Sequence, residues 1–258
     1  MKRDGRNREI FIASDLTTGY HHRGQRRIVS VPLHLSLRCG GVTALIGPNG
    51  SGKSTLLRTI AGMQPALSGE MFLQSREYET YSVRERARLI SVVLTGRSTP
   101  GHIPAGRLVE LGRYPHTNVL DRLTERDHRV VAWALKAAGA EELGSRPVDE
   151  LSDGELQKVM IARALAQEPK MILLDEPTAF LDITRKIELM HLLKTISAEQ
   201  NTAVLISSHD LELVLRIADT VWLLDEEGGL HEGTTEDKEF SGRMHEVFRI
   251  PSAFSLDD

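Results

Sequence analysis

The chain has 258 residues, of which 40% are hydrophobic and 26% charged, a balance typical of a globular protein with a sizeable core. Its net charge of −4 argues against a general nucleic-acid binder, because such proteins usually carry an excess of basic residues. The single cysteine, Cys39, excludes an internal disulfide, and no apolar run approaches the roughly 18 residues of a membrane span. Without a secretory signal at its start, the chain is expected to be cytoplasmic.

The first third of the chain predicts strands around a glycine-rich loop. Apolar side chains alternate through residues 28–37, as in a strand with one buried face, whereas residues 42–46 form the continuous apolar run of a strand covered on both faces. The basic segment 19–27 is expected to be a turn. A helix after the loop is expected to end at Gly62, a suitable left-handed cap. The expected strands span residues 9–14, 28–37, 42–46, 68–73 and 89–94.

Strand signals vanish between Gly96 and about Glu150, where short helical patterns take their place. The clearer helices are expected at 104–112 and 124–139. Strands resume at 171–175, 202–208 and 220–225, separated by helices at about 183–199 and 210–218. Strand and helix alternation on both sides of a helical insert predicts a mainly parallel sheet with one all-helical lobe, followed by a polar, helical tail.

Residues 47–54 match the phosphate-loop pattern G-x-x-x-x-G-K-[ST]. Its glycines let backbone N–H groups wrap a phosphate at a helix amino terminus, Lys53 is expected to reach the β and γ phosphates, and Ser54 to ligate Mg²⁺. The alternative is a glycine turn that only caps a helix. The strand before the loop and the helix after it are the context that phosphate binding requires. The expected ATP ligands are Gly47, Pro48, Asn49, Gly50, Ser51, Gly52, Lys53, Ser54 and Thr55.

The apolar strand MILLD at 171–175 ends in two consecutive carboxylates, Asp175 and Glu176. Ligands of open parallel sheets bind at the carboxyl ends of strands, so both acids are expected beside the phosphate loop. Asp175 is expected to hold the magnesium ion, and Glu176 to deprotonate the water that attacks the γ-phosphorus. The alternative is a solvated turn at the end of a strand.

A second helix start of anion-binding character lies in LSDGELQKVMIARALAQ, at 151–167. Small polar residues, Ser152, Asp153 and Gly154, pass directly into an amphipathic pattern. Taken alone, the segment also fits an ordinary helix cap without a ligand.

Together these motifs resemble an ATP-binding subunit of an ABC transporter over nearly the whole chain. The resemblance implies a P-loop NTPase core with a mainly parallel sheet, an antiparallel N-terminal β subdomain and an inserted α-helical lobe. It places the core at about 9–95 and 161–235, the lobe at about 96–160 and a C-terminal tail at about 236–258. The matching segments are Walker A at 47–54, Walker B at 171–177, the signature at 151–155, the D-loop at 179–182 and the switch histidine His209.

The resemblance also explains why one chain carries two phosphate-binding helix starts. In this family two cassettes pack head to tail, and each ATP lies between one phosphate loop and the partner's signature. Ser152, Gly154 and Glu155 are therefore implied to bind the partner's nucleotide. Asp153 replaces the usual glycine, and we expect it to point away from phosphate and to cap its own helix. Glu155 replaces the usual glutamine, in a first helical turn that tolerates negative charge.

Four further roles are implied by position. Tyr20 stands where the family stacks an aromatic ring on adenine, with an edge-strand tyrosine as the alternative. His209 is placed to contact the γ-phosphate, with a satisfied loop histidine as the alternative, and Asp182 is placed to couple the two sites across the dimer. The usual glutamine after the strand before the lobe is replaced by Thr95, which either reaches magnesium through a water or leaves the lobe coupled differently.

The segment LVELGRYPHTN at 108–118 resembles importers of iron-siderophores, haem and cobalamin, although a helix with a proline stop is the simpler interpretation. The implied function is an ATPase motor that uses Mg²⁺ and ATP. A homodimer on the inner face of the cell membrane is expected to drive separate permease subunits, with a substrate-binding protein and no nucleic acid. The alternatives are a soluble ABC ATPase that remodels nucleic-acid or ribosomal complexes, and a nucleotide kinase or GTPase that shares only the phosphate loop.

Overall fold

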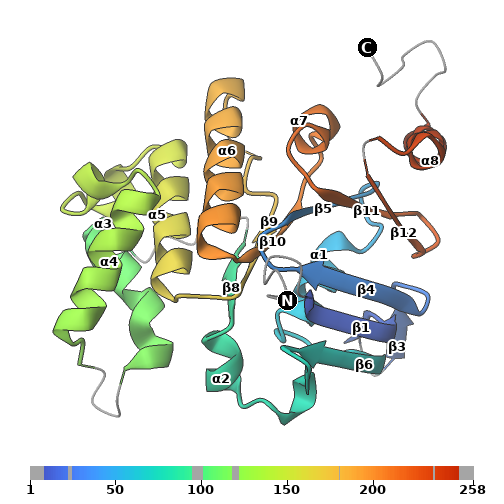
Figure 1. Cartoon of the computed structure of the whole chain (residues 1–258), viewed down its shortest axis with the longest axis horizontal. Helices are drawn as coiled ribbons and strands as arrows, with labels where there is room; N and C mark the ends of the chain where they lie inside the picture. Colours follow the sequence, from blue (N-terminus) through green and yellow to red (C-terminus); the bar gives the residue numbers. More distant parts are fainter. Residues whose placement is uncertain are drawn as a thin grey trace, which may run out of the picture.

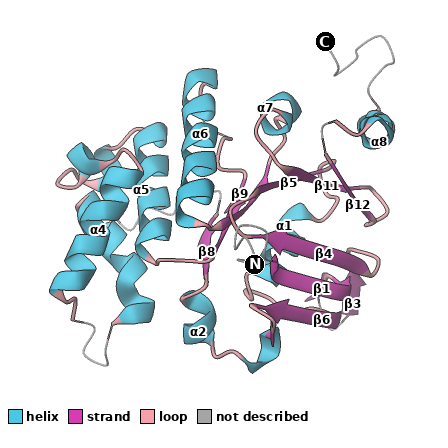
Figure 2. Ribbon diagram, in the orientation of Figure 1, coloured by secondary structure: helices cyan, strands magenta, loops and turns pink. Residues whose placement is uncertain are grey.

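The structure of the protein, a computed structural model, describes residues 9–22, 25–94, 101–117, 122–179, 181–234 and 236–249. Three parts are visible in Figures 1 and 2: a central sheet, a smaller antiparallel sheet beside it, and a group of helices at the far side of the central sheet. None of the helices in these ranges combines the length and apolar character needed to cross a bilayer.

The central sheet has six strands in the order β12-β11-β5-β10-β9-β8. Five of them run parallel and only the edge strand β12 is antiparallel. Every residue of β5, β9 and β10 is buried, which is why these strands consist of continuous apolar runs. The strands are β5 (Val42–Ile46), β8 (Ile90–Val93), β9 (Met171–Asp175), β10 (Ala203–Ser207), β11 (Thr220–Leu224) and β12 (Leu230–Gly233).

The N-terminal sheet is antiparallel, in the order β4-β1-β6-β7, and a separate hairpin joins β2 to β3. Apolar side chains from this sheet, from α1 (Lys53–Ile60) and from one face of the central sheet form a shared core that includes Phe11, Leu56 and Trp222. The strands are β1 (Glu9–Thr17), β2 (Gly19–His22), β3 (Gln25–Ile28), β4 (Leu33–Arg38), β6 (Ser68–Leu73) and β7 (Arg76–Glu77).

Two sequence predictions in this region are wrong. The strand expected over 28–37 begins only at Leu33, because Pro32 lacks an N–H for a ladder and the Val31 amide donates instead to the Gly228 carbonyl, 3.1 Å away. The basic segment 19–27, expected as a turn, forms most of the β2–β3 hairpin, in which Tyr20 pairs with Arg27.

The helical lobe consists of α3, α4, α5 and the short 3-10 helices between them, and it packs on the central sheet through a continuous core. The inserted lobe and the mainly parallel core confirm the predicted fold class. The proposed boundary near residue 160 falls inside the continuous helix α5 and stays a prediction. The helices are α2 (Val83–Ala87), α3 (Ala105–Glu110), α4 (Glu125–Ala137), α5 (Asp153–Ala166), α6 (Ile183–Gln200), α7 (Leu211–Leu215) and α8 (Lys238–Phe248), with 3-10 helices η2 (Tyr78–Thr80), η3 (Leu111–His116), η4 (Glu141–Leu143) and η5 (Val148–Glu150).

Candidate nucleotide site

The glycine-rich loop joins the buried strand β5 to the amino terminus of α1. Gly47 and Gly52 have positive φ angles of 154° and 104°. A Cβ at Gly47 would lie 2.3 Å from the Leu224 carbonyl oxygen, and one at Gly52 would lie 2.4 Å from a Val29 methyl group. Both positions therefore require glycine, which holds the loop against β11 and turns its backbone toward the helix start.

Lys53, the first residue of α1, is 6% exposed, and its ammonium lies within the loop. Its Nζ donates to the carbonyl oxygens of Gly47, at 2.7 Å, and Pro48, at 2.9 Å. Burial lowers the pKa of Lys53, although the carboxylates of Glu176 and Asp175 act in the opposite direction. The loop thus holds a desolvated cation that gains from an added anion.

Asp175 ends β9 and gathers hydroxyl groups from two other elements. Its Oδ1 accepts from Ser54 Oγ at 3.3 Å and from Ser207 Oγ, at the end of β10, at 2.7 Å. The parallel register places Ser207 directly beside Asp175. A carboxylate next to the Ser54 hydroxyl is the hard oxygen donor set that Mg²⁺ prefers when phosphate oxygens complete its shell, so these residues fit the expected metal.

Glu176 has a left-handed backbone with φ 47°, uncommon for a residue with a side chain. Its amide donates to Ser207 Oγ at 2.9 Å, and its half-buried carboxylate forms an ion pair with His209 Nε2. No local sequence pattern indicates this backbone conformation or the contact with Ser207. The two groups predicted to act on the γ-phosphate are therefore in direct contact.

Lys53, Ser54, Glu176 and His209 line one pocket of about 260 Å³, whereas Asp175 lies behind Ser54 and is not part of its lining. Tyr20, 39% exposed, lies on its wall with part of the phosphate loop, Glu176 and His209. Arg27, which sequence analysis did not assign to the site, also lines the pocket, with its guanidinium 5.9 Å from the Tyr20 ring centroid. The full lining is Tyr20, Arg27, Val29, Asn49, Gly50, Gly52, Lys53, Ser54, Thr55, Glu176 and His209.

The signature segment lies elsewhere, at the start of α5. Ser152 is the N-cap and forms a capping box with Glu155, whose carboxylate accepts from the Ser152 amide at 2.9 Å and hydroxyl at 2.8 Å. These bonds, together with the Arg146 guanidinium, lower the pKa of Glu155 to about 2. The expectation that Asp153 caps this helix is wrong, because Ser152 occupies the cap and Asp153 is the first helical residue.

The signature residues and Asp182 are not in the lining of the nucleotide pocket. Among the described residues that line the nucleotide pocket, none comes from segment 151–155. Gly154 faces Leu181 and Arg185 instead, at the start of α6. The Asp182 carboxylate caps α6 by accepting from the Arg185 amide at 3.0 Å. Thr95 lies outside the described residues.

Comparisons with known proteins show the family to which the chain belongs. The family described as ABC transporter matches residues 31–179, more than half of the chain. The iron(3+)-hydroxamate import ATP-binding protein FhuC of Bacillus subtilis is 33% identical over 231 residues, which cover 90% of this chain and 86% of the relative.

Two solved structures are similar over most of the chain. An ABC transporter described as metal-chelate type, in an inward-facing conformation, has a TM-score of 0.80 and 28% identity, covering 95% of this chain and 90% of the other. A dimeric ATP-binding cassette in a post-hydrolysis state, bound to ADP and Pi, has a TM-score of 0.76 and 26% identity, covering 88% and 99%. The chain belongs to the ABC transporter family, as an ATP-binding subunit with ATPase activity.

Proposed function

We propose that this chain is the ATP-hydrolysing motor of an importer of the iron-siderophore, haem or cobalamin class. It acts as a homodimer on separate integral membrane permease subunits, at the inner face of the cell membrane, with a substrate-binding protein in the full system. The similarity to an iron(3+)-hydroxamate import protein supports this class, as does the segment 108–118. The observation that carries the ATPase mechanism is the Glu176–His209 ion pair in the pocket that contains Lys53 and Ser54.

In this mechanism the chain's own residues bind and orient the triphosphate. The phosphate loop wraps the β and γ phosphates, and Lys53 neutralises part of their charge in a desolvated setting. Ser54 and Asp175 hold Mg²⁺, which when bound offsets phosphate charge. Tyr20 provides a ring for the adenine, and Arg27 beside it adds a positive charge at the pocket wall.

Glu176 is the general base in this proposal. Its backbone is fixed by the Ser207 hydroxyl and its carboxylate is oriented by His209. It accepts a proton from the attacking water, while His209 donates to the γ-phosphate.

The second half of each site comes from the partner's signature. Ser152 offers its hydroxyl and Gly154 its amide to the γ-phosphate bound by the other protomer. The Glu155 carboxylate accepts from the Ser152 amide and hydroxyl in the capping box, so its role is to position Ser152 and the start of α5. In the proposed dimer the hydroxyl turns its one proton from Glu155 to the phosphate, while the amide bond to Glu155 stays. Asp182, at the start of α6, lies near the signature helix and couples the two sites in the dimer.

The transport function is tested in the organism that makes the chain. Deleting the gene is expected to abolish energy-dependent uptake of a radiolabelled ferric hydroxamate, ferric catecholate, haem or cobalamin. Wild-type protein restores that uptake, whereas Glu176→Gln at equal abundance does not. Unchanged uptake of all four compounds, together with ATPase activity stimulated by RNA or ribosomes, would contradict the proposal and support the soluble remodelling alternative.

A further inference from the structure

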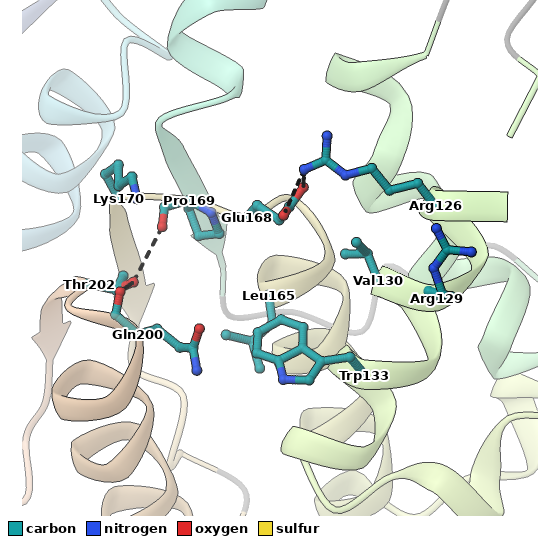
Figure 3. Close-up of a pocket in the computed structure, with 10 residues that line it drawn as sticks. All are labelled: Arg126, Arg129, Val130, Trp133, Leu165, Glu168, Pro169, Lys170, Gln200 and Thr202. Atoms are coloured by element: carbon teal, nitrogen blue, oxygen red, sulfur yellow. Dashed lines mark hydrogen bonds and ion pairs between the residues drawn. The ribbon is translucent and has the colours of Figure 1, made fainter. Parts of the chain in front are cut away.

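A second pocket, of about 380 Å³, lies between the helical lobe and the core (Figure 3). Its core side includes Lys170 and Thr202, which directly precede β9 and β10. The carboxyl ends of the same strands carry Asp175 and Ser207 of the nucleotide site. Five residues of extended strand span roughly 16 Å. The pocket is therefore at the opposite edge of the sheet from the phosphate loop and plays no part in the mechanism described above.

The lobe side of this pocket is one face of α4. Arg126, Arg129 and Trp133 recur at positions i, i+3 and i+7, so their side chains share a face. The face that α4 buries in the lobe is a different one and includes Val131 and Leu135. The Trp133 indole is left 38% exposed at the pocket, where it lies beside Leu165 with Gln200 across from it in Figure 3. α4 thus presents an aromatic ring one to two turns beyond two arginines on the same face.

Among the described residues that line the pocket, Glu168 is the one carboxylate, and it is already engaged. Glu168 accepts from Arg126 Nη2 at 3.3 Å and from the buried Arg113 Nη1 at 2.8 Å. Arg113 also pairs with Asp127 at 2.9 Å. In this group two arginine charges are balanced by two carboxylates, so Glu168 has no charge left to neutralise other cations of the pocket.

Two cations of the pocket, Arg129 and Lys170, are not neutralised by a closely paired carboxylate. The nearest carboxylate to Arg129 is that of Glu125, 3.9 Å away, and both side chains are more than 70% exposed, so their attraction is weak. The Lys170 ammonium forms no hydrogen bond or ion pair with any residue that the structure describes. The pocket thus combines an exposed indole with two cations that can accept an anionic partner.

We propose that this pocket binds a small aromatic anion, whose ring packs against Trp133 and whose carboxylate, sulfonate or phosphate pairs with Arg129 and Lys170. The volume lies in the range typical of small-molecule sites. A neutral aromatic compound would pack only against the indole, and a small aliphatic anion would pair only with the two cations. A ligand here contacts both the lobe and the core. The proposal stands on the pocket alone and is independent of the transport function.

Two probes with the same ring, one anionic and one neutral, test the ligand class. The full chain, with ADP and Mg²⁺ in excess, is titrated into 4-(trifluoromethyl)benzoate or 4-(trifluoromethyl)benzyl alcohol and followed by ¹⁹F NMR. Saturable broadening is expected for the benzoate, with the alcohol binding at least about tenfold more weakly, because it lacks charge-assisted hydrogen bonds. Equal binding of both probes, no saturable binding of the benzoate, or benzoate binding seen only when ADP is left out would overturn the proposal. Binding seen only without ADP would assign the probe to the nucleotide site.

Variants locate the binding. Trp133→Ala and the double variant Arg129→Glu with Lys170→Glu are each expected to weaken benzoate binding about tenfold or more. Lys136→Ala, which removes an exposed cation of α4 outside the pocket, is the matched control and is expected to bind as wild type. Circular dichroism checks the fold. If Trp133→Ala does not fold, the charge-reversal variant decides, since Arg129 and Lys170 are exposed. Wild-type affinity in the folded pocket variants would refute the assignment.

Discussion

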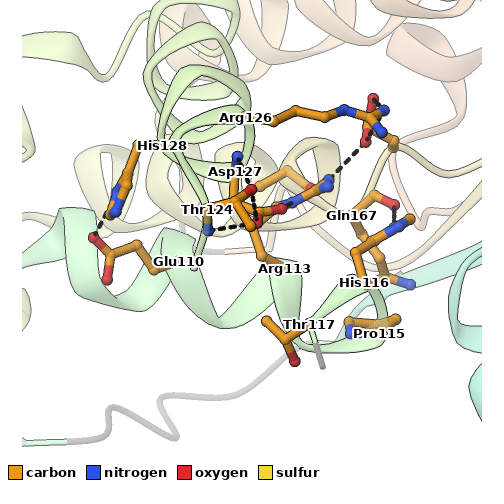
Figure 4. A network of polar contacts seen from close by, with 12 residues as sticks. Glu110, Arg113, Pro115, His116, Thr117, Thr124, Arg126, Asp127, His128 and Gln167 are labelled. Carbon is orange, nitrogen blue, oxygen red and sulfur yellow. Dashed lines mark hydrogen bonds and ion pairs between the residues drawn. The ribbon is translucent and has the colours of Figure 1, made fainter. Parts of the chain in front are cut away.

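The nucleotide site and the Arg113 cluster of the helical lobe both bury a cation, but they satisfy it differently. Arg113 is 1% exposed, and its guanidinium donates to Asp127, to Glu168 and to the Ala166 carbonyl at 2.6–2.9 Å (Figure 4). Lys53 is 6% exposed and donates to two carbonyl oxygens of its own loop. The lobe thus contains the counter-charges of its arginine.

This difference separates structural charges from functional ones. The Arg113 cluster joins η3, α4 and the end of α5, and its buried ions are paired within the chain. In the nucleotide site the carboxylates of Asp175 and Glu176 are held by hydroxyls and by His209, and neither forms an ion pair with Lys53 among the described contacts. A cation and carboxylates kept apart in one pocket leave room for a phosphate and a metal between them.

The largest expected effect comes from the nucleotide side of this comparison. Glu176→Gln removes the proposed base while keeping size and shape, so kcat for ATP is expected to fall by roughly 10²–10⁴-fold with ATP affinity retained. Steady-state ATPase assays and equilibrium nucleotide binding measure the two quantities. Glu239→Gln, which removes an exposed carboxylate of α8, is the control and should keep wild-type turnover. Unchanged kcat in Glu176→Gln would exclude this residue as the base.

In the helical lobe, removal of the buried Arg113 is expected to lower the stability of the fold. Arg113→Met leaves Asp127 buried and Glu168 partly buried without their common cation, so the free energy of unfolding is expected to fall by about 3–5 kcal/mol. Urea denaturation measures this change. Arg216→Met breaks the exposed pair with Glu212 and is expected to cost less than about 1 kcal/mol. Equal losses in the two variants would remove the distinction between the buried cluster and a surface ion pair.

The same cluster predicts a pH dependence. Burial raises the pKa of Asp127, but hydrogen bonds from Thr124 and Arg113 outweigh it and bring the pKa to about 2, below the ordinary 3.8. Between these two pKa values the unfolded state therefore binds more protons than the folded state. The contribution of the Asp127 carboxylate to the free energy of unfolding is complete above about pH 4 and is lost as the pH falls to about 2. Its size is about 2 kcal/mol. Asp127→Asn should flatten the pH dependence of unfolding in this range, whereas a slope like that of wild type contradicts the assignment.

The smallest effect is expected at the adenine wall. Tyr20→Ala should raise the KM for ATP about three- to tenfold with little change in kcat, because it removes a stacking ring and no phosphate contact. Tyr20→Phe keeps the ring, so its KM for ATP should remain within about twofold of the wild-type value. Steady-state kinetics separate the outcomes. A large loss in Tyr20→Phe would show that the hydroxyl, and not the ring, contributes to binding.

Continuous apolar runs predicted the core strands well. The ranges expected for β5 and β9 match the structure to the residue, because each apolar run is bounded by glycine or charged residues. The range expected for β6 also matches. The β2–β3 hairpin was missed because its sequence is polar and basic. β3 is exposed throughout, and the hairpin is held by backbone pairing, so no apolar alternation marks it.

The site was predicted in its residue types but not in its geometry. The spacing of the phosphate loop identifies Lys53 and Ser54, and the end of an apolar strand identifies Asp175 and Glu176. The contact of Ser207 with both acids depends on the register of β9 against β10, which no local pattern encodes. Arg27 enters the site only through its hairpin pairing with Tyr20, a tertiary consequence of a hairpin that sequence analysis did not predict.

In the proposed mechanism a working nucleotide site needs the phosphate loop of one protomer and the signature of another. This requirement is checked by measuring specific ATPase activity against protein concentration, with the mass followed by light scattering. Activity per protomer is expected to fall toward zero as the dimer fraction falls, and Ser152→Ala and Gly154→Asp are expected to lose activity even where dimers can form. Full activity from a preparation whose mass is that of a single protomer, unaffected by both substitutions, would contradict it.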